Sequence, residues 1–246
     1  MISRREFNAG LLFGLGNLLL PRNSYGLSQS IETQTASWKN GNHAFITQAK
    51  NNKYRAEIVS AREITGKSFA STKEVLERTQ AYVCLNGGFF ENDGSTSGLY
   101  VRKGKIVKPY TLGKGGGVLY TDKKYQAHIV TENEFTRHRN DVVDAIQVNL
   151  LRSADKIMYK EDINAKKLPR NLIGIASGGL VDVIFKDTNF TLGDRYMKIT
   201  YGCDTVAALD GGPSASGVDK FGNNSFRKGD IKEVEVPNFL CLWRKW

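Results

Sequence analysis

Short segments rich in β-branched and aromatic residues dominate this chain of 246 residues. Turn-forming residues bound them, which is typical of β-strands, and Ser177-Gly178-Gly179 predicts a tight hairpin between two of them. No linker, low-complexity segment or convincing repeat interrupts residues 35–246, so we expect one domain there. The expected strands are 43–48, 54–60, 81–86, 98–108, 116–121, 125–130, 144–149, 171–177, 180–186, 204–209 and 233–243.

Helical signals are fewer. Ser71 and Glu74 have the spacing of a capping box, which predicts a helix directly after Ser71. Further helices are expected over 153–162 and 191–200. Runs of strands with scattered helices favour an α+β fold: a strand-rich single domain with mixed or antiparallel sheets and a few packed helices. The regular strand–helix alternation of Rossmann folds and α/β barrels is missing from the sequence.

The first thirty residues predict an export signal. Arg4 and Arg5 precede an apolar stretch from Ala9 to Leu20, followed by a polar exit. This is the anatomy of a signal peptide, and the apolar stretch is shorter than the ~20 residues that span a bilayer. Ser-Arg-Arg-x-Phe resembles the twin-arginine signal. We therefore expect a periplasmic or secreted protein whose leader contacts the export machinery transiently; an uncleaved amphipathic anchor is the alternative.

The cysteines and the net charge say less about fold and function than the leader does. Three cysteines allow at most one disulfide within the chain, and the pairing of Cys203 with Cys241 stays open. Cys84 lies in an apolar run and is expected to be a buried small hydrophobe. The net charge of +10 is spread along the chain and suits either an anionic partner or solubility alone. Without a nucleic-acid recognition motif, no nucleic-acid partner is expected.

Two segments share one pattern, an apolar strand followed by Asn or Asp and then Gly-Gly. The first ends in Asn86-Gly87-Gly88 and the second in Asp210-Gly211-Gly212. Such strands place a polar side chain at a sheet edge, and the glycines let a ligand approach the backbone. Hairpin turns are the competing explanation, because Asx-Gly is common in them. Asp210 is the better candidate, since a carboxylate after five apolar residues is costly unless it is used or paired.

Other chemistries are less well supported by the residues. The three histidines lack the spacing of zinc ligands. The glycine-rich segment 113–117 lacks the spacing of a P-loop, and Ser214 lies outside any nucleophile elbow. Glu91 follows the first Gly-Gly pair and could face the same cleft, with loop solubility as the alternative role.

An ordered set of motifs resembles the phosphodiester glycosidase family, which includes the enzyme that uncovers mannose 6-phosphate and many bacterial relatives. The motifs span residues 80–217 in the family's order. Two segments depart from its usual pattern: Val148 follows Gln147 where relatives carry a Gln-Ser-Gly-Pro-like stretch, and Asn171 follows Arg170. The matching segments are Asn86-Gly87-Gly88-Phe89-Phe90, Gly98-Leu99-Tyr100-Val101, Gly104-Lys105, Pro169-Arg170-Asn171, Ile173-Gly174-Ile175 and Leu209-Asp210-Gly211-Gly212-Pro213-Ser214.

The resemblance implies an exported hydrolase that cleaves a sugar-1-phosphodiester in a glycan or cell-surface polymer such as an exopolysaccharide. Phosphate is a good leaving group, so one carboxylate with a cation on the phosphate suffices chemically. Asp210 takes the role of base or nucleophile, and Glu91 is the second carboxylate. Arg170 clamps the phosphate. Asn86 orients the substrate, and the remaining binding residues are Gly87, Gly88, Gly211, Gly212 and Ser214.

Two other functions remain open from the sequence. One is a non-catalytic periplasmic protein that binds or processes polysaccharide, and the other is a phosphodiesterase that cleaves P–O instead of C–O. No cofactor is expected. Ca²⁺ held by Asp210, Asp219 and nearby carbonyls is an alternative that the spacing does not demand.

Overall fold

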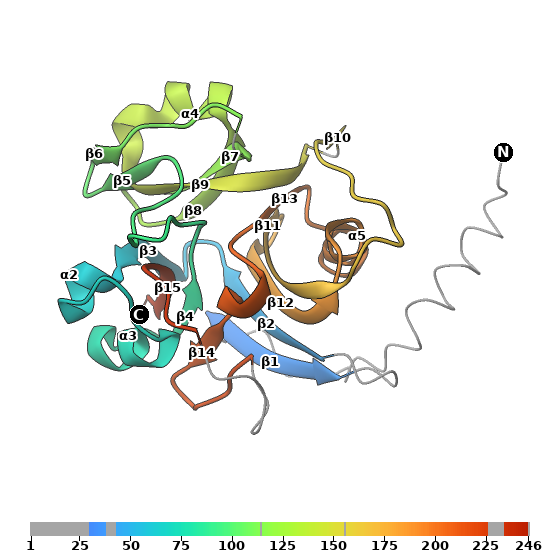
Figure 1. The fold of residues 1–246 in the computed structure, drawn as a ribbon, viewed down its shortest axis with the longest axis horizontal. Helices are drawn as coiled ribbons and strands as arrows, with labels where there is room; N and C mark the ends of the chain where they lie inside the picture. Colours follow the sequence, from blue (N-terminus) through green and yellow to red (C-terminus); the bar gives the residue numbers. More distant parts are fainter. Residues whose placement is uncertain (1–29, 38–42, 114, 155, 226–233, 246) are drawn as a thin grey trace, which may run out of the picture.

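The computed structural model describes residues 30–37, 43–113, 115–154, 156–225 and 234–245, which form two antiparallel sheets and a few helices (Figure 1). The predicted leader therefore lies outside the described residues, except for its last residue. The expected fold class is confirmed. All the paired strands are antiparallel, which settles the choice between mixed and antiparallel sheets for the described residues.

The larger sheet has 11 strands, and its main path runs in the order β1-β2-β12-β11-β13-β9-β5-β6. The long strand β9 joins its two parts, since it pairs with β13 near one end and with β5 and β7 near the other (Figure 1). The bounds are β1 Ile31–Ser37, β2 His43–Lys50, β5 Tyr100–Arg102, β6 Lys105–Lys108, β7 Gly116–Asp122, β8 Ala127–Thr131, β9 Val142–Ser153, β10 Lys156–Ile157, β11 Leu168–Ala176, β12 Gly179–Thr188 and β13 Thr205–Ala208.

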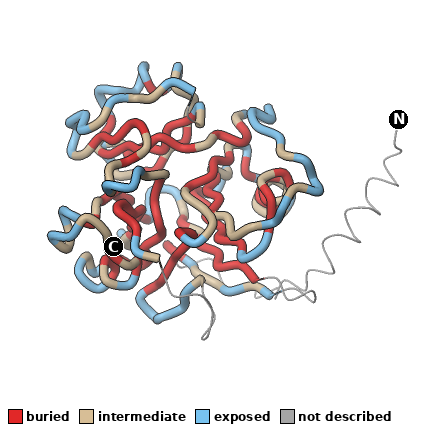
Figure 2. Tube along the Cα trace, in the orientation of Figure 1, coloured by how far each residue is buried: buried red, intermediate tan, exposed pale blue. Residues whose placement is uncertain are grey.

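The smaller sheet has 4 strands in the order β14-β4-β15-β3. It packs on the larger sheet through a shared core, in which Leu85 and Leu240 of the small sheet meet Ile146 and Ile173 of the large one. In Figure 2 the buried residues, drawn in red, run through the centre of the molecule. The bounds are β3 Tyr54–Ser60, β4 Val83–Asn86, β14 Gly217–Asp219 and β15 Asn238–Arg244.

The helices cover the outer faces. Helix α5 packs on the larger sheet through Tyr196 and Met197, and α3 packs on the smaller sheet through Val75 and Leu76. Ser71 caps α3 as its sequence predicts, because the Ser71 hydroxyl accepts a hydrogen bond from the Glu74 amide at 3.0 Å. The bounds are α2 Ala61–Thr65, α3 Thr72–Thr79, α4 Glu132–His138 and α5 Phe190–Tyr201, with 3₁₀ turns η1 Arg139–Asp141 and η2 Gly212–Ser214. Within the described residues, every helix is too short or too polar to cross a membrane.

Several sequence-based elements need correction. The helix expected over 153–162 is wrong: this stretch holds the end of β9, the short strand β10 and irregular chain. The strand expected over 98–108 is a hairpin of β5 and β6, because Lys103 and Gly104 take left-handed φ angles of 50° and 75°. The hairpin expected at Ser177-Gly178-Gly179 is confirmed, with Ala176 paired to Gly179.

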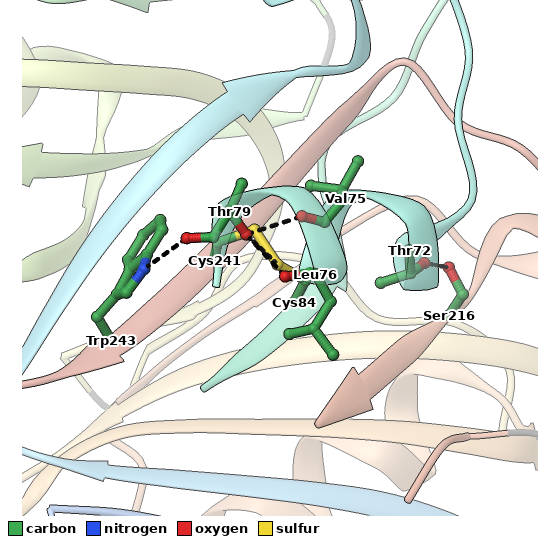
Figure 3. The surroundings of a disulfide bond; sticks show 8 residues. All are labelled: Thr72, Val75, Leu76, Thr79, Cys84, Ser216, Cys241 and Trp243. Atoms are coloured by element: carbon green, nitrogen blue, oxygen red, sulfur yellow. Dashed lines mark hydrogen bonds between the residues drawn. A yellow bond between two sulfur atoms is a disulfide. The ribbon is translucent and has the colours of Figure 1, made fainter. Parts of the chain in front are cut away.

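Cys84 is buried, as expected, and it forms a disulfide with Cys241 (Figure 3). The two residues face each other on β4 and β15 with a Cα–Cα distance of 4.3 Å. The expectation that Cys84 is a simple hydrophobe is therefore wrong, and Cys241 does not pair with Cys203, which is a free buried thiol. Helix α3 covers the bond, and the Thr79 hydroxyl lies 3.8 Å from the Cys84 sulfur.

The disulfide joins residues 157 positions apart, so it restricts the unfolded chain strongly. The double variant Cys84→Ala/Cys241→Ala should lose about 2–5 kcal/mol of unfolding free energy. Urea unfolding with and without dithiothreitol measures this. The wild type should lose stability in the reductant, whereas the double variant should not respond to it. Equal stability of the wild type in both buffers would contradict a stabilising disulfide.

Asp182 of β12 lies wholly in the core, and neither carboxyl oxygen finds a hydrogen-bond partner among the described residues. Burial raises its pKa well above 3.8. The folded state therefore keeps a proton that the unfolded state releases above pH 3.8, so this residue makes stability fall as the pH rises. Asp182→Asn should become more stable than the wild type, with a gap that widens from pH 4 to pH 8 in urea unfolding. Parallel stability curves for the two proteins would contradict this.

Candidate active site

The two Gly-Gly segments meet although 124 positions separate Asn86 from Asp210. Strand β4 of the smaller sheet ends at Asn86, and β13 of the larger sheet runs into Asp210. The Asp210 amide donates to the Gly87 carbonyl at 3.0 Å, and the Asn86 side-chain amide donates to the Asp210 carbonyl at 2.8 Å. The shared sequence pattern therefore marks one place in the fold, where strand ends from both sheets are joined.

The Asn86 side chain is fully buried and holds three segments together. Its oxygen accepts hydrogen bonds from the Asn171 side chain at 2.8 Å and from the Ser216 amide at 2.9 Å, while its nitrogen donates to Asp210. These bonds tie the end of β4 to β11, to the chain after β13 and to the segment before β14. The substrate-orienting role of Asn86 stays a prediction, and the structure gives this residue a positioning role beneath Asp210.

Asp210 carries its carboxylate at the partly exposed end of this junction. One carboxylate oxygen accepts from the Gly211 amide at 3.0 Å, and the Ser214 hydroxyl also bonds to the carboxylate. Burial raises the pKa of Asp210 above 3.8, and the two hydrogen bonds oppose that rise in pKa. A carboxylate of raised pKa that is still reachable from solvent is suited to accept a proton during a reaction.

The glycines have steric roles that differ along the two segments. A Cβ on Gly87 would overlap the Asn238 side chain, and a Cβ on Gly211 would lie 3.1 Å from the Pro169 carbonyl oxygen. Gly212 has a φ of +61°, which opens the short turn η2 after Asp210. Gly88 lies against β9. Substrate binding by these glycines remains a prediction, whereas the close packing at residues 87 and 211 is a property of the fold.

Arg170 of β11 lies next to this turn. Its Cδ would be 3.6 Å from a Cβ on Gly211, so the backbone that carries Asp210 runs alongside the arginine stem. The guanidinium stacks 3.9 Å above the Phe190 ring at the start of α5, and its Nη2 lies 3.6 Å from Glu161. Arg170 therefore lies close to the backbone next to Asp210. The guanidinium contacts Phe190 and Glu161, whereas the Asp210 carboxylate bonds to Gly211.

Glu91 lies in an exposed loop after the first Gly-Gly pair. The Ser97 hydroxyl donates to its carboxylate at 2.6 Å, and the Gly94 amide donates to its carbonyl. Both contacts stay within the loop, whereas the bonds of Asp210 run to Gly211 and Ser214. Its role as a second carboxylate stays a prediction.

Sequence reasoning missed Glu161, Phe190 and Ser216 at this site. Glu161 lies in irregular chain and Phe190 begins α5, so no spacing links either of them to Arg170. Ser216 contributes its backbone amide, a group that every non-proline residue has. Only the tertiary fold brings these residues to Asn86 and Arg170.

Within the described residues, no group of three or more His, Cys, Asp or Glu side chains could hold a metal ion. Asp219, named above as an alternative Ca²⁺ ligand, accepts hydrogen bonds with its carboxylate at the end of β14. One oxygen accepts from the Phe221 and Asn223 amides at 2.9 Å, and the other accepts from the Asn223 side chain at 2.9 Å. These bonds shape the turn after β14 and lie on the smaller sheet. The need for a cofactor is untested.

Comparison with known proteins agrees with this geometry. The sequence profile of the phosphodiester glycosidase family matches residues 79–243. The chain therefore belongs to the phosphodiester glycosidase family, as its motifs suggested. No curated protein matches the chain by sequence.

Two solved structures share the fold. The catalytic domain of zebrafish N-acetylglucosamine-1-phosphodiester alpha-N-acetylglucosaminidase, described as auto-inhibited by its pro-peptide, superposes with a TM-score of 0.65 at 15% identity. That match covers 90% of this chain and 86% of the zebrafish chain. A hypothetical protein from Synechocystis matches with a TM-score of 0.59 at 12% identity, over 88% of this chain and 62% of that one. These likenesses show the architecture, while the family match rests on the sequence.

The buried amide of Asn86 is open to a direct test. Asn86→Ala leaves the Asn171 side chain and the Ser216 amide without their acceptor, which should cost about 2–4 kcal/mol of unfolding free energy. Urea unfolding followed by tryptophan fluorescence measures the loss. Asn92→Ala in the exposed loop is the matched control and should stay within about 0.5 kcal/mol. A loss no larger than that of the control would show that the junction does not depend on Asn86.

Proposed function

We propose that this protein hydrolyses a sugar-1-phosphodiester by breaking the bond between the anomeric carbon and the phosphate oxygen. The observation that carries the proposal is the site at the end of β13. There, a partly exposed carboxylate of raised pKa, Asp210, is followed by Gly211, where an added Cβ would lie 3.6 Å from Cδ of Arg170. Membership of the phosphodiester glycosidase family supports this reaction class.

The reaction needs few groups because phosphate leaves readily. Water attacks the anomeric carbon, its proton passes to the Asp210 carboxylate, and the electrons of the breaking C–O bond leave with the phosphate. The products are a free sugar and a phosphate monoester. Arg170 would hold the phosphate by charge-assisted hydrogen bonds. In the other version of this mechanism, Asp210 itself attacks the anomeric carbon and water then releases the sugar.

We propose further that the protein works outside the cytoplasm, on a glycan or cell-surface polymer. The twin-arginine-like leader supports export. The disulfide between Cys84 and Cys241 supports it independently, because such bonds persist in oxidising compartments such as the periplasm. The net charge of +10 suits a substrate that carries phosphate.

The experiment incubates the chain without its leader with a panel of aryl and alkyl sugar-1-phosphodiesters in ¹⁸O-labelled water. Label in the sugar supports C–O cleavage. Label in the phosphate would replace this proposal with P–O cleavage. Saturable binding of an anionic polysaccharide without turnover of any panel member would favour a binding protein.

Asp210→Asn removes the proton acceptor while keeping nearly the same shape. Turnover of the best substrate should fall at least ~10²-fold, the usual scale of a positioned base. Asp204→Asn, at the other end of β13 and paired there with Lys198, is the matched control and should retain turnover within about twofold. Circular dichroism checks the fold of both variants. Near-wild-type turnover in folded Asp210→Asn would remove Asp210 from the mechanism.

A further inference from the structure

The carboxylate of Glu161 lies beside the arginine that would hold the phosphate. Its Oε1 is 3.6 Å from Nη2 of Arg170, and its Oε2 accepts a hydrogen bond from the Phe190 amide at 2.8 Å. Phe190 is the first residue of α5, where the helix dipole favours negative charge. The same residue carries the ring on which the guanidinium stacks. One negative charge is therefore built into the surroundings of Arg170.

Glu161 is fixed in this position. Besides the bond from Phe190, its amide donates to the Thr191 hydroxyl at 3.0 Å, and its carbonyl accepts from that hydroxyl at 2.5 Å. The Glu161 side chain is only 19% exposed and that of Arg170 16%. The two Thr191 bonds anchor the Glu161 backbone to the first turn of α5, and the bond from the Phe190 amide would have to break before the carboxylate could swing away. Glu161 should thus stay near Arg170 when a ligand binds.

The ion pair leaves hydrogen-bonding capacity on the arginine. The distance of 3.6 Å between Nη2 and Oε1 exceeds the 2.7–3.2 Å of an ordinary N–H···O hydrogen bond. The Nε of Arg170 finds no hydrogen-bond partner among the described residues either, but it is buried and would need its neighbours to move before a ligand could reach it. Because Nη2 is not hydrogen-bonded to Glu161 and the Arg170 side chain is partly exposed, the guanidinium can bind an oxygen of a ligand while Glu161 remains in place. That ligand then lies close to a fixed carboxylate.

We infer that Glu161 makes the Arg170 clamp selective for the charge of the phosphate, holding a monoanionic diester and releasing a dianionic monoester. The inference rests on the proposed function, in which the substrate is the diester and the product is the monoester. A phosphate monoester carries a charge of about −1.5 to −2 at pH 7, whereas a diester carries one negative charge. A carboxylate held at short range in a partly buried site repels each added negative charge. Glu161 is thus a specificity-determining residue that promotes release of the product.

The chain offers a matched control in the next residue. Asp162 lines, with Glu161, a cavity of about 420 Å³ at the start of α5, and it carries the same charge. Its carboxylate accepts from the Asn164 amide at 2.8 Å and belongs to a local turn instead of the Arg170 pair. Glu161→Gln and Asp162→Asn therefore change the net charge equally, and only the first alters the charge beside the guanidinium. Glutamine keeps an oxygen for the Phe190 amide, so the loop should keep its conformation.

The test measures binding of phenyl phosphate and methyl phenyl phosphate at pH 8 by isothermal titration calorimetry. Glu161→Gln should bind the monoester about tenfold more tightly than the wild type and the diester only about two- to threefold more tightly. Asp162→Asn should leave both affinities within about twofold. An unchanged ratio of the two affinities in Glu161→Gln would overturn the inference. So would an equal change of that ratio in Asp162→Asn, or no binding of either probe to wild type and Glu161→Gln.

Turnover of the sugar-1-phosphodiester panel is scored separately with the same proteins. If the wild type turns over a substrate and the affinity ratio does not change, the hydrolase proposal stands and the role of Glu161 fails. If the ratio changes as expected and no substrate is hydrolysed, the charge selectivity of the clamp stands and hydrolysis fails. If the protein hydrolyses a panel member and the affinity ratio also changes as expected, Glu161→Gln should show about tenfold stronger inhibition by the monoester product.

Discussion

The hydrogen bonds of the buried Asn86 amide join the two sheets at the point where the chemistry would occur. A polar side chain with no exposure must find all its partners inside the protein, and those of Asn86 come from β11 and from the segments around Asp210 and Ser216. The orientation of the Asp210 backbone therefore depends on a group that never meets solvent. Outside the sheets, α3 extends this support, because the Thr72 and Ser216 hydroxyls share a hydrogen bond of 2.6 Å (Figure 3).

Asp210 and Arg170 have different surroundings. Burial raises the pKa of the Asp210 carboxyl, which makes this group a better proton acceptor. Around Arg170, an aromatic ring and a carboxylate lie against the guanidinium. In the proposed reaction, Asp210 would exchange a proton, while Arg170 would offer a positive charge that Glu161 weakens. The division suits a reaction in which a proton moves at the sugar and the charge on the phosphate grows.

Most strands were predictable because their signal is local. Runs of β-branched residues bounded by turns located β2, β3, β7 and β12 to within a few residues. The strand β1 was not predicted, since Ile31–Ser37 is an edge strand of mostly polar residues beside the excluded leader. The helix predicted over residues 153–162 was wrong, because the composition of this stretch does not indicate that β10 pairs briefly with β9. The disulfide was equally unpredictable, because only the register of β4 with β15 places Cys84 opposite Cys241.

The sequence by itself determined the fold class, the family and the two Asx-Gly-Gly segments, because each depends on residue types in a local order. It also singled out Asp210, since a carboxylate after an apolar strand is costly unless it is used. Tertiary structure alone decided that Asn86 is an interior joint and that Glu161 stands beside Arg170. The physical reason is that hydrogen bonds and charge pairs act over a few ångströms in space. Strand order and register, rather than spacing along the chain, set which groups come within that range.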